Sequence, residues 1–224
     1  DVERSRGLGD VYKRQVVMAM LAYPLSRPNY KYKKIATFFI FFTMLFSGGL
    51  IPTYIWITRY LHLGDTIWVY ILPCLVNAFH VIVIRSFFQG LPQALMESAK
   101  IDGASELQTF FKIVMPLSKP VIATISLLTL LSRWNDWNTA LIYIKSSNLY
   151  SLQYLLQKIL REAEFVKNMA DSSPVAGMDL DLSNLPSVTI RFAMCMVAAG
   201  PMLIIFPFFQ KYFAKGLTVG AVKG

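Results

Sequence analysis

Four long apolar runs, separated by polar stretches, dominate the hydrophobic pattern of the chain. They cover residues 35–57, 66–87, 121–144 and 188–209. Each run is about as long as the roughly 20 residues that a helix needs to cross a bilayer. Gly48, Gly49 and Pro52 interrupt the first run near one end, where neighbouring helices can cover the loosened backbone. The pattern predicts an all-α polytopic membrane protein with about four complete spans.

The chain before the first run fits this pattern poorly. Residues 1–15 are polar and show no apolar period, and the mostly apolar stretch 16–23 is far too short for a span. A basic cluster of Lys31, Lys33 and Lys34 follows. Our hypothesis is that 16–23 is the inner end of a partial span, whose remainder would precede this sequence. Residues 1–15 are then a non-native or atypical tract, which we leave out of the fold prediction.

A polar island over residues 90–118 separates the second and third runs. A polar stretch between two spans must lie in water, on one side of the bilayer. Its pattern predicts two short helices that bend at Gly103, because Pro92 suits a first helical turn and Ser105 can cap the second helix. The apolar residues of the second helix follow i, i+3, i+4, i+7 spacing and are predicted to share one face: Leu107, Phe110, Phe111 and Val114.

Composition and charge support a membrane protein and predict its orientation. The chain is 55% hydrophobic and 16% charged, and its net charge of +9 comes from basic residues beside the apolar runs. We therefore predict a lipid bilayer and no nucleic acid as its surroundings. Threading four spans places most basic residues on the face of the polar island, which is predicted to be cytoplasmic. Residues 145–186 fall on the other face, with four basic residues against five acidic ones.

Few side chains offer candidate chemistry. Cys74 and Cys195 lie in predicted spans, and His62 and His80 are isolated, so we predict no catalytic residue, metal site or cofactor. The third run contains Arg133-Trp134-Asn135-Asp136-Trp137, and charges at this depth must face water or a partner. Two interpretations stay open. The segment is an interfacial aromatic belt with a snorkelling arginine, or Asn135 and Asp136 border a translocation pathway.

The polar island resembles the EAA loop of ABC importer permeases. That loop reads Glu-Ala-Ala, three residues, Gly, nine residues, Ile, one residue, Leu-Pro. The residues in register are Glu97, Ala99, Gly103, Ile113 and Pro116, with Ser98 and Met115 replacing an alanine and the leucine. Three further segments resemble sugar-importer permeases of the type I, maltose-permease-like branch: residues 22–27, 134–136 and 209–224.

The resemblance implies an ABC importer type I transmembrane domain over residues 16–209, with a cytoplasmic coupling helix. The coupling loop would be 90–118, the external segment 145–186 and the cytoplasmic tail 210–224. It implies a permease subunit of an ATP-driven carbohydrate (oligosaccharide) importer in a bacterial or archaeal plasma membrane, with no enzyme activity of its own. The expected partners are a second permease subunit, a cytoplasmic ATPase dimer, an extracytoplasmic substrate-binding protein and the carbohydrate.

The resemblance also assigns roles to residues of the loop. Glu97 would pair with a basic residue of the ATPase, and Ala99 and Gly103 would allow close approach and the bend. Leu107, Phe110 and Phe111 would hold the loop to the permease body or to the ATPase groove. The full set of expected coupling residues is Glu97, Ser98, Ala99, Asp102, Gly103, Phe110, Ile113 and Pro116.

Two other functions remain as alternatives. An amino-acid or polyamine importer of the same superfamily shares the EAA loop, although the tail and the Trp134-Asn135-Asp136 segment favour sugars. A channel or carrier outside the ABC class would need no ATPase and therefore no such loop. An intramembrane enzyme would need paired catalytic groups, which the sequence does not offer.

Overall fold

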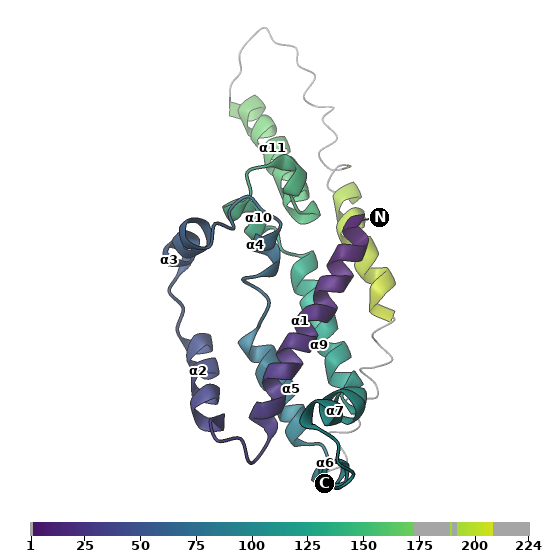
Figure 1. Cartoon of the computed structure of the whole chain (residues 1–224). Helices are drawn as coiled ribbons and strands as arrows, with labels where there is room; N and C mark the ends of the chain where they lie inside the picture. Colours follow the sequence, from purple (N-terminus) through teal and green to yellow (C-terminus); the bar gives the residue numbers. More distant parts are fainter. Residues whose placement is uncertain (1, 173–188, 190–191, 208–224) are drawn as a thin grey trace.

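The computed structural model describes residues 2–172, 189 and 192–207, and every regular element in these residues is a helix (Figure 1). The labelled helices are α1 (Val2–Ser26), α2 (Lys33–Leu45), α3 (Leu50–Ile55), α4 (Trp68–Ile71), α5 (Ala78–Gln89), α6 (Gln93–Ile101), α7 (Glu106–Thr109), α8 (Met115–Leu117), α9 (Lys119–Trp134), α10 (Asn138–Tyr143) and α11 (Leu152–Ser172). The others are π-helical turns at Trp56–Tyr60 and Phe110–Val114, a 3₁₀ turn at Ser147–Leu149, and a helix at Phe192–Pro207. The predicted all-α class is confirmed for this part of the chain.

None of the helices in the described ranges is, by itself, both long enough and apolar enough to cross a membrane. Two bent pairs reach that length and composition together. They are Lys33–Leu45 with Leu50–Tyr60, bent by 111°, and Glu106–Leu117 with Lys119–Trp134, bent by 76°. Two shorter apolar helices are Ala78–Gln89 and Phe192–Pro207. The number of spans therefore stays a prediction.

Helix breaks occur in more apolar runs than the sequence pattern predicts. The first run breaks where expected, at Gly49, whose φ is +85°. The second run, by contrast, divides into α4 and α5 around Pro73, which has no N–H to donate. The Asn77 side chain then starts α5 by accepting the N–H of His80 at 3.1 Å. The missing N–H of Pro73 and the side-chain cap of Asn77 thus decide where α4 and α5 separate.

The main hydrophobic core joins α1, α5, α9 and the π-helical turn 110–114, which lie side by side in the lower half of Figure 1. Its buried members are Met18, Ala19, Ala22, Tyr23, Leu25, Val81, Ile84, Phe88, Phe110, Val114, Val121 and Ile125. In contrast, α2 has no buried residue. The polar island is therefore anchored to the central helices.

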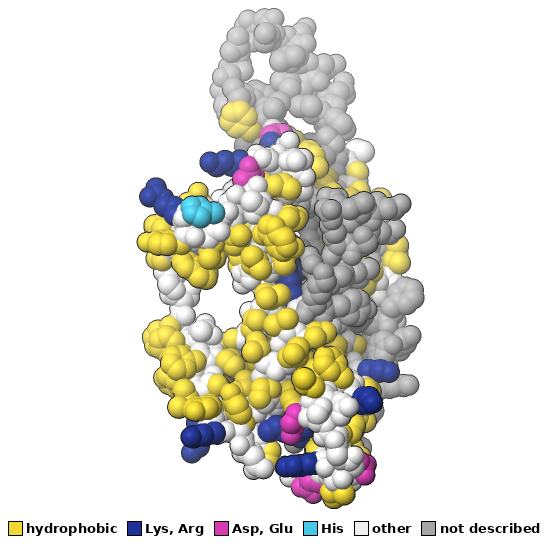
Figure 2. Space-filling model, in the orientation of Figure 1, with side chains coloured by type: hydrophobic (Ala, Val, Ile, Leu, Met, Phe, Trp, Pro, Cys, Tyr) yellow, Lys and Arg dark blue, Asp and Glu magenta, His cyan; other side chains and the backbone are white. Residues whose placement is uncertain are grey.

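The polar island and the external segment lie at opposite ends of the molecule. Figure 1 shows α6 and α7 at one end and α10 and α11 at the other. On the face drawn in Figure 2, described hydrophobic side chains cover the middle, and described charged ones gather toward the two ends. This arrangement agrees with the opposite faces that the charge pattern predicts for 90–118 and 145–186. Residues 173–186 and the predicted tail 210–224 lie outside the described residues.

A polar contact closes the end that carries α10. Asp65, at φ +54°, accepts hydrogen bonds from the Lys145 N–H at 2.9 Å and the Ser146 N–H at 2.8 Å, and from the Ser146 hydroxyl at 2.6 Å. The hydrogen bond from the Ser146 hydroxyl, followed by the two backbone bonds, lowers the pKa of the Asp65 carboxyl. This carboxylate ties the connection after α3 to the connection after α10.

Candidate functional site

The polar island folds as two short helices around a sharp bend. α6 ends in a Schellman arrangement, in which the Ala104 N–H donates to Ala99 O at 2.9 Å and the Gly103 N–H to Lys100 O at 3.1 Å. Gly103 has a φ of +78°, and no atom lies within 4 Å of the position that a Cβ would take. The glycine is therefore required by backbone conformation and not by lack of space. The predicted bend at Gly103 is confirmed.

Ser105 starts the second helix as predicted. Its hydroxyl accepts the Gln108 N–H at 3.2 Å, and the Gln108 side chain accepts the Ser105 N–H at 2.9 Å, which completes a capping box. This reciprocal pair fixes the start of α7 and places Glu106 in its first turn. The two helices around Gly103 thus have defined ends, so the loop has a defined shape.

The predicted coupling residues divide between surface and core. The exposed members are Glu97, Ser98, Asp102, Gly103 and Pro116, whereas Ala99 and Phe110 are buried and Ile113 is half-buried. Within the part of the chain that the structure describes, neither carboxylate of the exposed set forms an ion pair. The polar members are therefore accessible at the surface, whereas the buried members attach the loop to the helical body, and a coupling role for the set stays a prediction.

The predicted apolar face of the second helix is divided, which corrects the sequence analysis. Phe110 and Val114 are buried in the main core, but Leu107 is 62% exposed and Phe111 is 50% exposed. The reason is the π-helical turn over Phe110–Val114, since its wider winding moves residues off the i, i+3, i+4 stripe of an α-helix. The sequence analysis also missed Ile101, which ends α6 at 86% exposure.

A polar cluster joins the polar island to α1. The Tyr23 hydroxyl donates to the Glu106 carboxylate at 2.7 Å, and Arg27 donates to that same hydroxyl. The Arg27 guanidinium also lies 3.9 Å from the Glu106 carboxylate and 4.4 Å from the centre of the Tyr23 ring. Sequence reasoning assigned no role to these residues, because 83 positions separate Tyr23 from Glu106 and no local pattern relates them.

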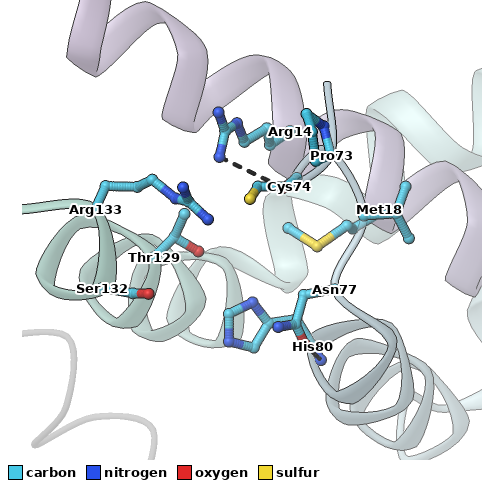
Figure 3. Close-up of a pocket in the computed structure, with 10 residues that line it drawn as sticks. Arg14, Met18, Pro73, Cys74, Asn77, His80, Thr129, Ser132 and Arg133 are labelled. Atoms are coloured by element: carbon cyan, nitrogen blue, oxygen red, sulfur yellow. Dashed lines mark hydrogen bonds between the residues drawn. The ribbon is translucent and has the colours of Figure 1, made fainter. Parts of the chain in front are cut away.

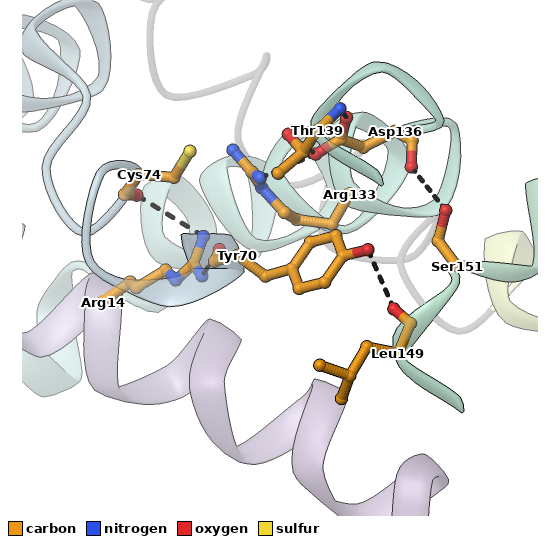
Figure 4. Close-up of polar contacts among 8 residues, drawn as sticks. All are labelled: Arg14, Tyr70, Cys74, Arg133, Asp136, Thr139, Leu149 and Ser151. Atoms are coloured by element: carbon orange, nitrogen blue, oxygen red, sulfur yellow. Dashed lines mark hydrogen bonds and ion pairs between the residues drawn. The ribbon is translucent and has the colours of Figure 1, made fainter. Parts of the chain in front are cut away.

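Arg133 and Asp136 come together, but Asn135 does not join them (Figure 4). The Arg133 guanidinium lies 3.0 Å from the Asp136 carboxylate, which also accepts the N–H of Thr139 at 3.1 Å and its hydroxyl at 2.8 Å. The Asp136 carbonyl accepts the Ser151 hydroxyl at 3.0 Å. Asn135 is exposed, and its amide donates to Leu131 O. Asp136 therefore lies in the connection between α9 and α10 and caps the first turn of α10 through Thr139, and a pathway role for either residue stays a prediction.

A small polar cavity lies between α1, α9 and the turn that precedes α5 (Figure 3). Its volume is about 160 Å³, and its polar lining includes Arg14, Asn77, His80, Thr129 and Arg133. His80 Nδ1 and the Thr129 hydroxyl are buried and have no hydrogen-bond partner among the described residues. His80 is isolated from other ionisable residues in the sequence, because Arg14 and Arg133 reach the cavity from distant parts of the chain. Arg14 belongs to residues 1–15, and the prediction that this tract is non-native or atypical stays a prediction.

Comparisons with known proteins extend over nearly the whole chain. Residues 15–219 match the family described as "Binding-protein-dependent transport system inner membrane component". The chain is 42% identical over 212 residues to the polygalacturonan/rhamnogalacturonan transport system permease protein YtcP of Bacillus subtilis, covering 92% of this chain and 70% of that protein. It is 43% identical over 204 residues to Protein LplC of the same organism, covering 91% of this chain and 66% of LplC.

A solved structure also resembles this fold. It is the crystal structure of a bacterial ABC transporter involved in the import of the acidic polysaccharide alginate. One of its chains matches with a TM-score of 0.72 and 29% identity, covering 92% of this chain and 74% of that chain. In the two sequence comparisons, the chain spans 70% of the length of YtcP and 66% of the length of LplC.

Proposed function

This chain belongs to the family of inner-membrane components of binding-protein-dependent transport systems, and we propose that it is the permease subunit of an ATP-driven carbohydrate importer. It forms half of the translocation pathway with a second permease subunit. It hydrolyses no ATP itself, since that reaction takes place in a separate cytoplasmic ATPase dimer. The relative named for polygalacturonan and rhamnogalacturonan transport favours an oligosaccharide over an amino acid or a polyamine as the substrate.

The observation that carries the proposal is the bent, exposed loop at one end of the helical body. Glu97 and Asp102 flank the bend at Gly103 and lie at the surface. A carboxylate in this place suits a charge-assisted contact with a basic residue of the ATPase. Leu107 and Phe111 are exposed beside the bend and suit an apolar groove on the same partner. The loop therefore offers both parts of a docking helix.

The proposal includes a membrane topology, which the location of the loop and the external segment at opposite ends of the molecule supports. The loop 90–118 and the tail 210–224 lie in the cytoplasm, and the segment 145–186 faces the substrate-binding protein outside. Four spans and part of another cross the membrane as helices interrupted at several points. Interruptions at membrane depth are tolerated where neighbouring helices cover the backbone. ATP-driven closure of the ATPase dimer then moves the loop and turns the spans between inward-open and outward-open states.

The test combines uptake, assembly and topology. The chain is expressed with the second permease and the ATPase from its genomic neighbourhood, and the complex is reconstituted in vesicles together with the substrate-binding protein. We expect ATP-dependent uptake of a labelled oligogalacturonide and co-purification of the ATPase. The topology test uses Lys100→Cys in a background in which Cys74 and Cys195 are replaced by serine. This variant should react with a membrane-impermeant maleimide only from the cytoplasmic side. Labelling of that cysteine from outside only, or the absence of the ATPase from the purified complex, would refute the proposal.

A further inference from the structure

We propose that Tyr23, Arg27 and Glu106 form a polar latch that carries the motion of the coupling loop into α1. The inference rests on the proposed function, since it assumes that the loop meets an ATPase. It goes beyond that function by assigning the transmission step to side chains outside the EAA pattern. Tyr23 and Arg27 are positioning residues, and Glu106 is their partner on the loop.

The geometry of the latch is specific. The Tyr23 hydroxyl donates to the Glu106 carboxylate at 2.7 Å, and Arg27 contacts both the hydroxyl and, at 3.9 Å, the carboxylate. The Arg27 guanidinium stacks 4.4 Å from the centre of the Tyr23 ring, so the cation and the ring are held together. The capping box at the start of α7 fixes Glu106 from its own side. Both halves of the latch are thus pre-positioned.

Packing beneath the latch makes the joint stiff. The Tyr23 ring meets the Phe110 ring edge to face, with centroids 5.1 Å apart, and the Phe88 ring at 6.4 Å. Phe110 belongs to the coupling loop and Phe88 to α5, so three elements meet around one tyrosine. In addition, Arg85 of α5 donates to the Leu25 carbonyl at 3.1 Å, which ties the same end of α1 to α5. A displacement of the loop therefore reaches α1 and α5 together.

The two halves of the loop have different surroundings. We therefore assign contact with the ATPase to the first half and transmission of the motion to α1 to the second. In α6 Ala99 is buried and Met96 packs partly buried against the main core, whereas the other residues of this helix are exposed. The second half buries Thr109, Phe110 and Val114 against the body. The latch lies in this second half, on the side of the loop that is joined to α1. Glu106 is therefore placed to transmit motion, whereas Glu97 is placed to receive it.

The ion pair of the latch is expected to add little to the stability of the fold, although Tyr23 itself is buried. The Glu106 side chain is 74% exposed and the Arg27 side chain is 22% exposed. An ion pair with one partner this exposed contributes little to stability because water screens it. Its loss should therefore appear in the coupling of transport to ATP hydrolysis and leave the fold intact.

The experiment uses the complete transporter in vesicles, with the variants Tyr23→Phe, Glu106→Gln and the double variant. The first variant keeps the ring that packs on Phe110, and the second keeps the size of the side chain. The measurement is the ratio of oligosaccharide transported to ATP hydrolysed. Each single variant should lower this ratio by about fivefold or more, the lower end of usual coupling strengths. Glu106→Gln removes the negative charge that faces Tyr23 and Arg27, although its amide oxygen can still accept a hydrogen bond. The double variant should be no worse than the poorer single variant, because both changes weaken the same charge-assisted contact.

Tyr32→Phe is the matched control, since Tyr32 is 55% exposed and its hydroxyl makes no hydrogen bond to the described residues. This control should keep the wild-type ratio. If the single variants also keep the wild-type transport-to-hydrolysis ratio while the ATPase co-purifies, the latch proposal is refuted and the proposed function stands. Additive losses in the double variant, or loss of the ATPase from the single variants, also overturn the latch. If Tyr23→Phe is poorly produced, the exposed Glu106→Gln variant decides. Failure of wild-type co-purification refutes the proposed function instead.

Discussion

Replacement of Gly103 isolates the contribution of one backbone conformation to coupling. Its φ of +78° lies in the left-handed region, and the space around a future Cβ is open. An alanine there meets no neighbour, so its whole effect comes from the backbone. For an ordinary L-residue the left-handed conformation is less stable by about 1–2 kcal/mol. Asparagine is better tolerated there than alanine, and a β-branched valine is tolerated worse.

The expected size of the effect follows from this strain. A free-energy difference of about 1–2 kcal/mol changes a two-state ratio by a factor of about 5–30. If the ATPase binds only the bent loop, its apparent affinity falls in proportion to the bent fraction. Gly103→Ala should therefore weaken ATPase binding by at most about 30-fold. Gly103→Pro should abolish coupling, because it fixes φ near −65° and removes the N–H that bonds Lys100 O at 3.1 Å.

The assay is the affinity of the purified permease for its ATPase, measured with uptake in vesicles. From highest to lowest, the affinity for the ATPase is expected to fall in the order glycine, asparagine, alanine, valine and proline at position 103. Gly48→Ala is the matched control, because the nearest atom to its Cβ would be Pro52 Cβ at an ordinary 3.8 Å and its φ lies outside the left-handed region. Equal affinity and uptake for the glycine, alanine and valine forms would refute the argument that the bend is required.

Three further predictions concern single side chains. Phe110→Ala should lower the free energy of unfolding by about 3–5 kcal/mol, because Phe110 is only 2% exposed, whereas Phe111→Ala should leave thermal stability nearly unchanged and weaken ATPase binding. Bonds from Ser146 lower the pKa of Asp65, so its stabilising effect is complete above the ordinary carboxyl pKa of about 4 and is lost as pH falls through the lowered value. Thermal melts of wild type and Asp65→Ala should therefore differ at neutral pH and converge in acid. Asp136→Ala should lower the melting temperature for two reasons. It removes the carboxylate that accepts the Thr139 N–H, a helix cap worth about 1 kcal/mol, and it leaves the half-buried Arg133 without its ion-pair partner. An unchanged melting temperature would contradict this capping role.

Local signals account for the parts of the molecule that the sequence predicts correctly. Ser105 and Gly103 act within a few residues of themselves, through a cap and a positive φ, so their roles can be read from neighbouring positions. Pro73 and Asn77 carry equally local signals for a helix break, but their apolar surroundings favoured one continuous span. The correct interpretation of that run depended on weighing side-chain hydrogen bonds above hydrophobicity.

Contacts across long stretches of sequence could not be predicted in the same way. Asp65 and Ser146 are 81 positions apart, and the Tyr23–Glu106 contact bridges 83 positions. Each of these pairs depends on how whole helices pack, and an acid beside a serine or tyrosine has no periodic signature. The division of the apolar face around Phe110 could not be predicted either, because the sequence spacing of the apolar residues does not reveal that a π-helical turn inserts one extra residue.

The position of Phe110 explains how a loop of two short helices can move a membrane domain. Its ring lies in one core with residues of α1, α5 and α9, so the loop cannot shift without displacing all three helices or opening that core. Interiors packed this densely change between discrete arrangements and do not deform continuously. In contrast, α2 buries no residue fully and contributes to this core the partly buried Ala36 and Ile40. A movement imposed at α6 is therefore expected to turn α1, α5 and α9 as one body, to which α2 is joined less firmly.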